Sequence, residues 1–134
     1  MSVFSHYPLQ KGILTALTAD NMLMGMITGI FDRVEEGQEY PYITFADISG
    51  ADWSTKTTSG MECSVNLHIW SREGGKKEAL LIMERVHDLL HDGNITVSGQ
   101  SLVLSRFSTA NVMLESDGIM YRGSMRFRIL LQAN

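Results

Sequence analysis

Residues 62–92 read ECSVNLHIWSREGGKKEALLIMERVHDLLHD, and the hydrophobic period of this stretch changes at Gly74-Gly75. Before the two glycines, apolar and polar residues alternate, which is the pattern of a β-strand with one buried and one exposed face. The alternating apolar residues are Cys63, Val65, Leu67 and Ile69. The first part of the stretch therefore predicts a half-buried strand.

After the glycines, apolar residues recur every three or four positions, which predicts an amphipathic helix over Lys76–Asp92. The apolar stripe of this helix consists of Ala79, Ile82, Met83, Val86, Leu89 and Leu90. We expect Gly93 to end the helix in the left-handed conformation that glycine adopts most easily. Apolar residues spaced every 3.6 positions, directly after apolar residues at every second position, predict a helix that packs on a sheet.

The flanking sequence predicts the other elements of this fold. Toward the N-terminus we expect a helix over Pro8–Ala19, a short helical turn capped by Asp20-Asn21 and ended by Gly29, a short edge strand over Phe31–Val34, and a strand that begins at Tyr42. Ser49–Gly60 is polar and has no period, so it predicts a long exposed loop. Toward the C-terminus we expect strands over Leu102–Met113 and Ile119–Leu131, joined at Ser116-Asp117-Gly118, where Asp-Gly is a hairpin signal.

These elements predict one α+β domain over residues 1–134. Its sheet should be antiparallel or mixed, with about four strands. One long helix and one or two short helices should pack on one face of the sheet.

The composition narrows the class of protein. The 134 residues are 44% hydrophobic and 19% charged, with a net charge of -4, which fits a chain with a core and argues against a dedicated nucleic-acid binder. Cys63 is the single cysteine, so no disulfide forms within the chain and we expect synthesis in a reducing compartment. No signal peptide or membrane span is evident, and we expect a soluble protein with no membrane partner.

The sequence favours neither a metal site nor a nucleophilic cysteine. His87 and His91 lie one turn apart on the predicted helix with Glu84 before them, but no further ligand lies nearby in the sequence. A small metal-dependent enzyme therefore stays a distant alternative, and we predict no metal. Cys63 is predicted to be buried and inert. Nucleophile-elbow, phosphate-loop and dinucleotide motifs are absent from the sequence, so we predict no enzyme, no catalytic residue and no cofactor.

Three features favour contacts with other proteins. The last predicted strand would turn Tyr121, Met125, Phe127 and Ile129 to the core and place Arg122, Arg126 and Arg128 on the opposite face, with Arg106 beside them. Two interpretations of these arginines have about equal support: a face exposed to solvent and an interface with another protein. Trp53 and Lys56 lie in the predicted polar loop, where Trp53 could anchor a partner or fold back on the sheet. Nine methionines, with Met22, Met24 and Met26 close together, suit adaptable contact surfaces.

A series of short motifs resembles one family over nearly the whole chain. They are, in order, Tyr40-Pro41-Tyr42-Ile43, Gly60-x-Glu62, Leu67-His68-Ile69-Trp70-Ser71-Arg72, Gly74-Gly75 with Glu78-Ala79, Val86-x-x-Leu89, His91-Asp92, Arg106-Phe107, Asp117-Gly118, Tyr121-Arg122-Gly123 and Arg126-Phe127-Arg128. Together they resemble the tail-completion proteins of long-tailed phages, prophages and gene transfer agents. This family was long known as a domain of unknown function and is related to tail terminators of the lambda U type.

The resemblance implies a non-enzymatic structural protein of the virion tail, assembled in the cytoplasm of the bacterial host. It implies a ring, typically a hexamer, that caps the head-proximal end of the tail tube, stops tube growth and helps join tail to head. The implied partners are further copies of the chain, the tail tube protein and the head-completion or connector proteins. A head-to-tail connector or a tail tube protein is the alternative.

Overall fold

The computed structural model describes residues 4–134, which form one mixed sheet with helices on one of its faces. The elements are α1 (His6–Thr18), α2 (Asn21–Met24), β1 (Ile30–Phe31), β2 (Tyr42–Asp52), β3 (Gly60–Ser71), α3 (Lys77–Leu90), β4 (Gln100–Leu114) and β5 (Tyr121–Ala133). In this part of the chain the sheet has five strands in the order β1-β2-β3-β5-β4. Only the two-residue β1 runs parallel to its neighbour, so the predicted α+β class with a mixed sheet is confirmed.

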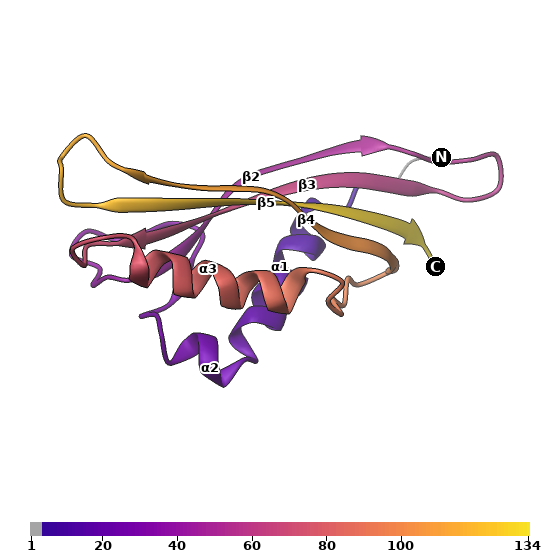
Figure 1. The fold of residues 1–134 in the computed structure, drawn as a ribbon. Helices are drawn as coiled ribbons and strands as arrows, with labels where there is room; N and C mark the ends of the chain where they lie inside the picture. Colours follow the sequence, from indigo (N-terminus) through magenta and orange to yellow (C-terminus); the bar gives the residue numbers. More distant parts are fainter. Residues whose placement is uncertain (1–3) are drawn as a thin grey trace.

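Within residues 4–134 the three helices lie on the same side of the sheet, and the opposite side carries no helix (Figure 1). The long α3 packs beneath β3, β5 and β4, while α1 packs beneath β2 and against α3. The buried residues of the sheet and helices meet between these two layers in one hydrophobic core. We call the side that no helix covers the open face of the sheet.

The helix α3 confirms the predicted stripe. Ala79, Ile82, Met83, Val86 and Leu90 are buried in the core, and Leu89 packs partly buried against it. Gly123 of β5 lies under this helix, where an added Cβ would stand 2.5 Å from Sδ of Met83. The Tyr-Arg-Gly motif therefore contains the residue that allows helix and sheet to approach closely.

The end of α3 differs from the prediction that Gly93 takes the left-handed conformation. Asp92 has the positive φ of 54°, and its N–H donates to the Ser105 carbonyl of β4 at 2.7 Å. Gly93 is needed for space, because an added Cβ would lie 2.1 Å from the carbonyl oxygen of Leu89. The bond to β4 explains why an aspartate rather than the glycine takes the strained position.

The N-terminal elements are shifted from their predicted bounds. Pro8 lies inside the first turn of α1, which begins at His6, and Asp20 caps α2 as predicted. This helix ends at Met24, and Gly29 instead makes room for the ring of Phe31, which would lie 2.6 Å from an added Cβ. The predicted short edge strand is present, but its bounds are Ile30–Phe31 rather than Phe31–Val34. Its two residues pair with Ile43 and Thr44 before the chain turns away.

The long loop predicted over Ser49–Gly60 is also wrong at both ends. Strand β2 continues to Asp52 and β3 begins at Gly60, so the connection is 53–59. Ser49 pairs with Ser64, and Ala51 pairs with Glu62. These pairs lie on the open face, where polar residues are tolerated. A register shift between Phe45 and Ile48 interrupts the alternation, so the outer half of β2 has no apolar period.

The hairpin between β4 and β5 confirms the Asp-Gly signal. Asp117 Oδ1 accepts hydrogen bonds from the backbone N–H groups of Ile119 and Met120, each at 2.9 Å. Gly118 follows with a φ of 72°, a conformation that glycine adopts without strain. The hairpin therefore holds β5 in antiparallel pairing with β4 along almost its whole length.

Candidate protein-interaction face

The open face is built by strand alternation in β3 and β5. In β3 the residues Cys63, Val65, Leu67 and Ile69 are buried in the core, and in β5 the core residues are Met125, Phe127, Ile129 and Leu131, with Gly123 also buried. Leu130 is buried as well but is not part of this core. The residues between the core residues point away from the helices. They include Glu62, Ser64, Asn66, His68 and Trp70 of β3 and Arg122, Ser124, Arg126 and Arg128 of β5. The predicted placement of the three arginines opposite the core is therefore what the structure contains.

Each of these arginines has a partner inside the chain. Arg122 Nε lies 3.1 Å from the Glu115 carboxylate, and Arg128 Nη2 donates to Glu62 Oε2 at 2.7 Å. Arg126 Nε donates to the side-chain oxygen of Asn66 at 3.1 Å, so its hydrogen-bonded partner is neutral. The arginines are held in place along the strand, and Arg126 keeps an uncompensated charge.

Arg106 adds a fourth guanidinium to the open face. Strand β4 pairs with β5 so that Arg106 lies directly opposite Arg128, and two like charges in this arrangement repel each other. Arg106 is exposed and forms no ion pair within the described residues 4–134. The middle of the open face therefore carries positive charge that the chain itself does not fully neutralise.

His68 sits on the same face beside this charge. Burial lowers the pKa of its imidazole, and the nearby Arg122 guanidinium lowers it further, against weaker opposite effects of Asp47 and Glu115. Its ring meets that of Trp70 edge-on, and the Trp70 indole donates to Thr44 Oγ1 at 3.0 Å. This end of the open face is thus aromatic, and the Trp70 ring is held by a hydrogen bond to Thr44.

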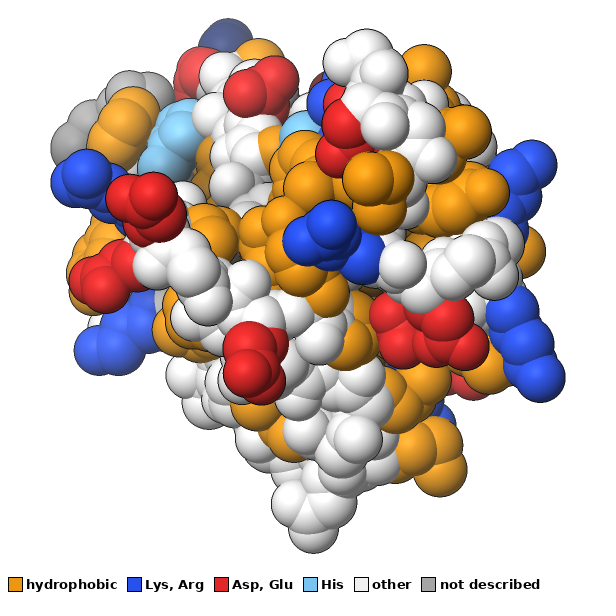
Figure 2. Space-filling model, turned by 90° about the vertical axis from the view of Figure 1, so that its left-hand side faces the viewer, with side chains coloured by type: hydrophobic (Ala, Val, Ile, Leu, Met, Phe, Trp, Pro, Cys, Tyr) orange, Lys and Arg blue, Asp and Glu red, His pale blue; other side chains and the backbone are white. Residues whose placement is uncertain are grey.

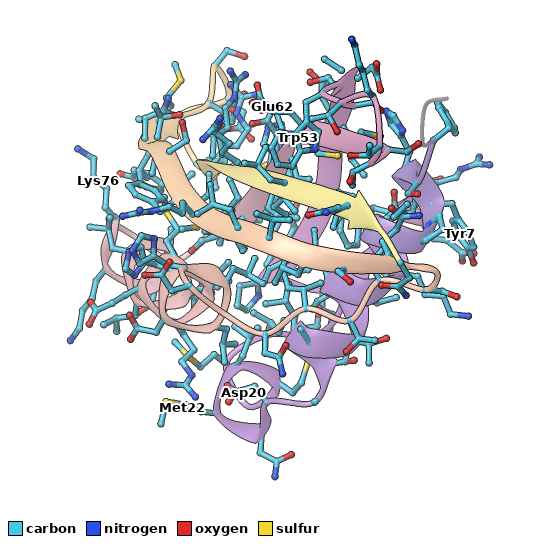
Figure 3. The ribbon with its side chains drawn as sticks, turned by 90° about the vertical axis from the view of Figure 1, so that its right-hand side faces the viewer. Tyr7, Asp20, Met22, Trp53, Glu62 and Lys76 are labelled. Atoms are coloured by element: carbon cyan, nitrogen blue, oxygen red, sulfur yellow. The ribbon has the colours of Figure 1, made fainter. Side chains whose placement is uncertain are left out.

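Trp53 folds back on the sheet, which was one of the two predicted possibilities. Its indole N–H donates to the Leu131 carbonyl at 2.8 Å and its ring lies over Gly60, where an added Cβ would be 2.3 Å from Nε1. It keeps 38% of its surface exposed, and Figure 3 shows it with Glu62 on the side of the sheet away from Asp20 and Met22. Lys56 is exposed in the adjoining 53–59 connection.

His87 of α3 and His91, which caps the end of this helix, contact each other and β4. Their rings stack with centroids 5.0 Å apart, and His91 Nδ1 accepts the backbone N–H of Phe107 at 3.0 Å. Glu84 is exposed on the helix. Among residues 4–134 no group of three or more His, Cys, Asp or Glu side chains is placed to hold a metal ion, and the absence of metal binding stays a prediction.

Sequence reasoning missed an apolar group at the β4–β5 hairpin. Met113, Leu114 and Ile119 are each about half exposed, at 49%, 49% and 51%. Figure 2, which looks onto this end of the molecule, shows hydrophobic side chains at the surface among charged ones. The available signal was the pair Met113-Leu114, since two consecutive apolar residues in a strand cannot both face the core.

An acidic segment was missed as well. We call residues 32–39 the acidic segment, because it contains four carboxylates, those of Asp32, Glu35, Glu36 and Glu39, against the single charge of Arg33. All four carboxylates are exposed, and none forms an ion pair with another described residue. The three glutamates line a hollow of about 700 Å³ together with Tyr40, Tyr42 and Arg72.

Known proteins resemble the chain over almost its whole length. The family model for tail completion protein gp17 matches residues 11–132. The tail completion protein gp17 of Bacillus phage SPP1 is 27% identical over 128 residues, which are 94% of this chain and 93% of that protein. The solved structure of the SPP1 gp17 protein is 26% identical and has a TM-score of 0.64, with 90% of this chain and 86% of that chain covered.

A second solved structure shares the fold. It is a chain in the virion of a native gene transfer agent particle, with a TM-score of 0.86 at 24% identity, and the match covers 93% of this chain and 95% of that one. Among the described residues, no helix combines the length and the apolar character that crossing a membrane requires.

Proposed function

Because this chain belongs to the tail completion protein gp17 family and is a structural protein of a virion tail, we propose that it caps the tail tube. In this proposal several copies form a closed ring on the head-proximal end of the tube. The ring stops tube growth at that end and offers a new surface on which the head is joined. The protein acts by binding alone, without catalysis and without a cofactor.

The match along the whole chain is the observation that carries this proposal. The match with the tail completion protein gp17 of Bacillus phage SPP1 covers 94% of this chain and 93% of that protein. A tube of stacked rings always ends in a surface that can accept another ring. Growth therefore stops only when a different subunit occupies that surface and offers no copy of it. A compact domain with unlike faces meets this requirement.

The distribution of polar groups is consistent with binding rather than chemistry. On the open face the charged side chains are mostly paired with one another, as in Arg128 with Glu62 and Arg122 with Glu115. Arginine is enriched in contact surfaces between proteins, because its planar guanidinium pairs well with carboxylates of a partner. We infer that Arg122, Arg126 and Arg128, with Trp53 and Lys56 at the end of the same sheet, contribute to contacts with the tube or with neighbouring copies.

Deleting the gene from the phage, prophage or gene transfer agent that encodes it tests the proposal. We expect tails that are overlong or that fail to join heads, seen by negative-stain electron microscopy, and we expect a plasmid copy to restore normal particles. Tails of normal length joined to heads in the deletion strain would refute the capping role.

The same experiment separates the alternatives. Complete absence of tails, with capsids present, would indicate a tube protein, because the tube itself could not form. Tails of correct length that stay free of heads would indicate a connector, because length control would be intact. Immunogold labelling of wild-type particles adds an independent result: we expect label at the junction of head and tail and none along the tube.

A further inference from the structure

The acidic segment and the open face carry opposite charges, and part of each charge has no ion-pair partner within residues 4–134. In residues 32–39 the four exposed carboxylates lie within eight residues and form no ion pair within the described part of the chain. On the open face, Arg106 has no carboxylate partner among residues 4–134, and the hydrogen-bonded partner of Arg126 is a neutral amide. Arg106 also faces the like charge of Arg128 across the β4–β5 pair.

The two charged surfaces form no ion pair with each other within residues 4–134. The acidic segment follows β1 at one edge of the sheet, whereas Arg106 and Arg126 lie on β4 and β5 at the other edge. Strands β2 and β3 separate β1 from β5 in the sheet. Two complementary surfaces on different parts of one subunit allow a head-to-tail contact, which closes into a ring when the rotation between copies is right.

We propose that the acidic segment of one copy docks on the arginines of the open face of the next copy, and that this head-to-tail contact builds the ring. This inference rests on the proposed capping function and specifies its interface. The occupant of the open face is thus a second copy of this chain. The neighbour's Arg106 and Arg126 would enter the hollow that is lined by Glu35, Glu36 and Glu39, and at its border by Arg72.

The chemistry of the two surfaces favours this pairing. Guanidinium groups form paired hydrogen bonds to carboxylates, and such bonds are stronger and more directional than contacts between neutral groups. A carboxylate placed between Arg106 and Arg128 would also relieve their mutual repulsion. A nucleic-acid strand is a weaker candidate for the open face, because Glu62 and Glu115 lie among the arginines and the whole chain has a net charge of -4.

Cysteine cross-linking in assembled tails tests the contact without changing any charge. Gln38 lies in the acidic segment, and Thr109 is exposed and pairs with Arg126 in the sheet. We expect the Gln38→Cys/Thr109→Cys variant to give a ladder of linked subunits on a non-reducing gel after treatment with a short bis-maleimide. Each single variant should run as a monomer on the same gel. Native Cys63 should not react, because it is buried. The matched control is Gln38→Cys/Leu81→Cys, whose second position is exposed on α3.

Charge exchange gives an independent second test. Glu35→Lys/Glu36→Lys and Arg106→Glu/Arg126→Glu should each lower the yield of head-joined particles by about a hundredfold, because like charges then meet at the contact. Combining all four changes in one chain should restore the yield to within about tenfold of wild type, because opposite charges meet again. Circular dichroism of each purified variant checks that it is folded.

Three results would overturn the inference. The first is the absence of a ladder in tails that join heads normally, and the second is a dimer band from either single-cysteine variant. The third is a quadruple variant that is folded, like all the others, but does not regain the yield of head-joined particles. Arginine variants that assemble normally but lose affinity for DNA would assign the open face to nucleic acid instead. If the deletion strain makes overlong tails and the ladder is absent, the capping function stands and only this interface fails.

Discussion

Arg85 of α3 donates two hydrogen bonds to the carboxylate of Asp20, from Nε to Oδ2 at 2.9 Å and from Nη2 to Oδ1 at 2.6 Å. The same Oδ2 accepts the backbone N–H of Leu23 at 2.8 Å. Asp20 is therefore the N-cap of the short helix α2 and also its attachment to α3. Figure 3 shows Asp20 at the far side of the helical layer from the sheet.

This pair predicts a defined dependence of stability on acid. The bonds from Arg85 and from the Leu23 backbone lower the pKa of Asp20 from 3.8 to about 2. A carboxyl whose pKa is lower in the folded chain stabilises the fold above its unfolded pKa, and this contribution is lost as the pH falls through the folded pKa. We expect Asp20→Asn, which keeps the capping oxygen, to lower the urea midpoint at neutral pH and to converge with wild type toward about pH 2.

The matched control for Asp20→Asn is Glu84→Gln on α3. Glu84 is exposed and forms no ion pair within residues 4–134, so this change should leave the urea midpoint unaltered at every pH. An Asp20→Asn variant whose loss of stability is the same at neutral and at acid pH would contradict the assignment to the charged pair.

Cys63 should be inert in the folded protein. Burial raises the pKa of its thiol to about 11, and the neighbouring Glu62 carboxylate adds to this effect. We expect no reaction with Ellman's reagent at mildly alkaline pH until urea unfolds the chain, because the reagent attacks the exposed thiolate. Ser64→Cys is the comparison, since this neighbouring residue points to the open face and should react within minutes. A fast reaction of native Cys63 would show that the core of the sheet opens readily.

The indole of Trp53 depends on the absence of a side chain at Gly60. An added Cβ would lie 2.3 Å from its Nε1 atom, so Gly60→Ala should displace the ring and break its bond to Leu131. We expect a loss of stability of about 1–3 kcal/mol and faster hydrogen exchange of the Trp53 indole N–H by NMR. Gly74→Ala is the control, because no atom lies within 4 Å of its added Cβ. An unchanged exchange rate at Trp53 would contradict the packing.

The elements that were predicted best are those in which apolar residues recur at a regular spacing along the sequence. The α3 stripe and the alternation in β3 and β5 each bury one face, so their periods appear in the sequence and the arginines of β5 could be assigned to the exposed side. The outer half of β2 was mistaken for a loop because it lies on an open face and follows a register shift, where nothing requires apolar alternation. Strand pairing holds this segment in the sheet, and local sequence does not encode it.

Contacts between distant residues could not be predicted. The bond between Asp20 and Arg85 joins positions 65 apart, and that between Trp53 and Leu131 joins positions 78 apart. Likewise, the carboxylates of the acidic segment are obvious in the sequence, but their lack of ion pairs is visible only when the fold is known. The candidate face was therefore half predicted, with the arginines found and the complementary segment missed.

The last prediction concerns the three arginines of β5 as a group. Replacing Arg122, Arg126 and Arg128 with Glu should leave a folded subunit, because each exposed ion pair contributes about 0–1 kcal/mol and the buried residues of the strand are unchanged. The same change would place new carboxylates beside Glu62 and Glu115 and against any acidic partner, at a cost of several kcal/mol where the arginines are buried in an interface. We expect folded protein by circular dichroism and tails that are overlong or unjoined by electron microscopy. The matching Gln variant, which removes the charges without reversing them, should give a milder defect. Normal tails from the Glu variant would show that the arginines form only a solvated surface, and would leave the capping role to be decided by the deletion strain.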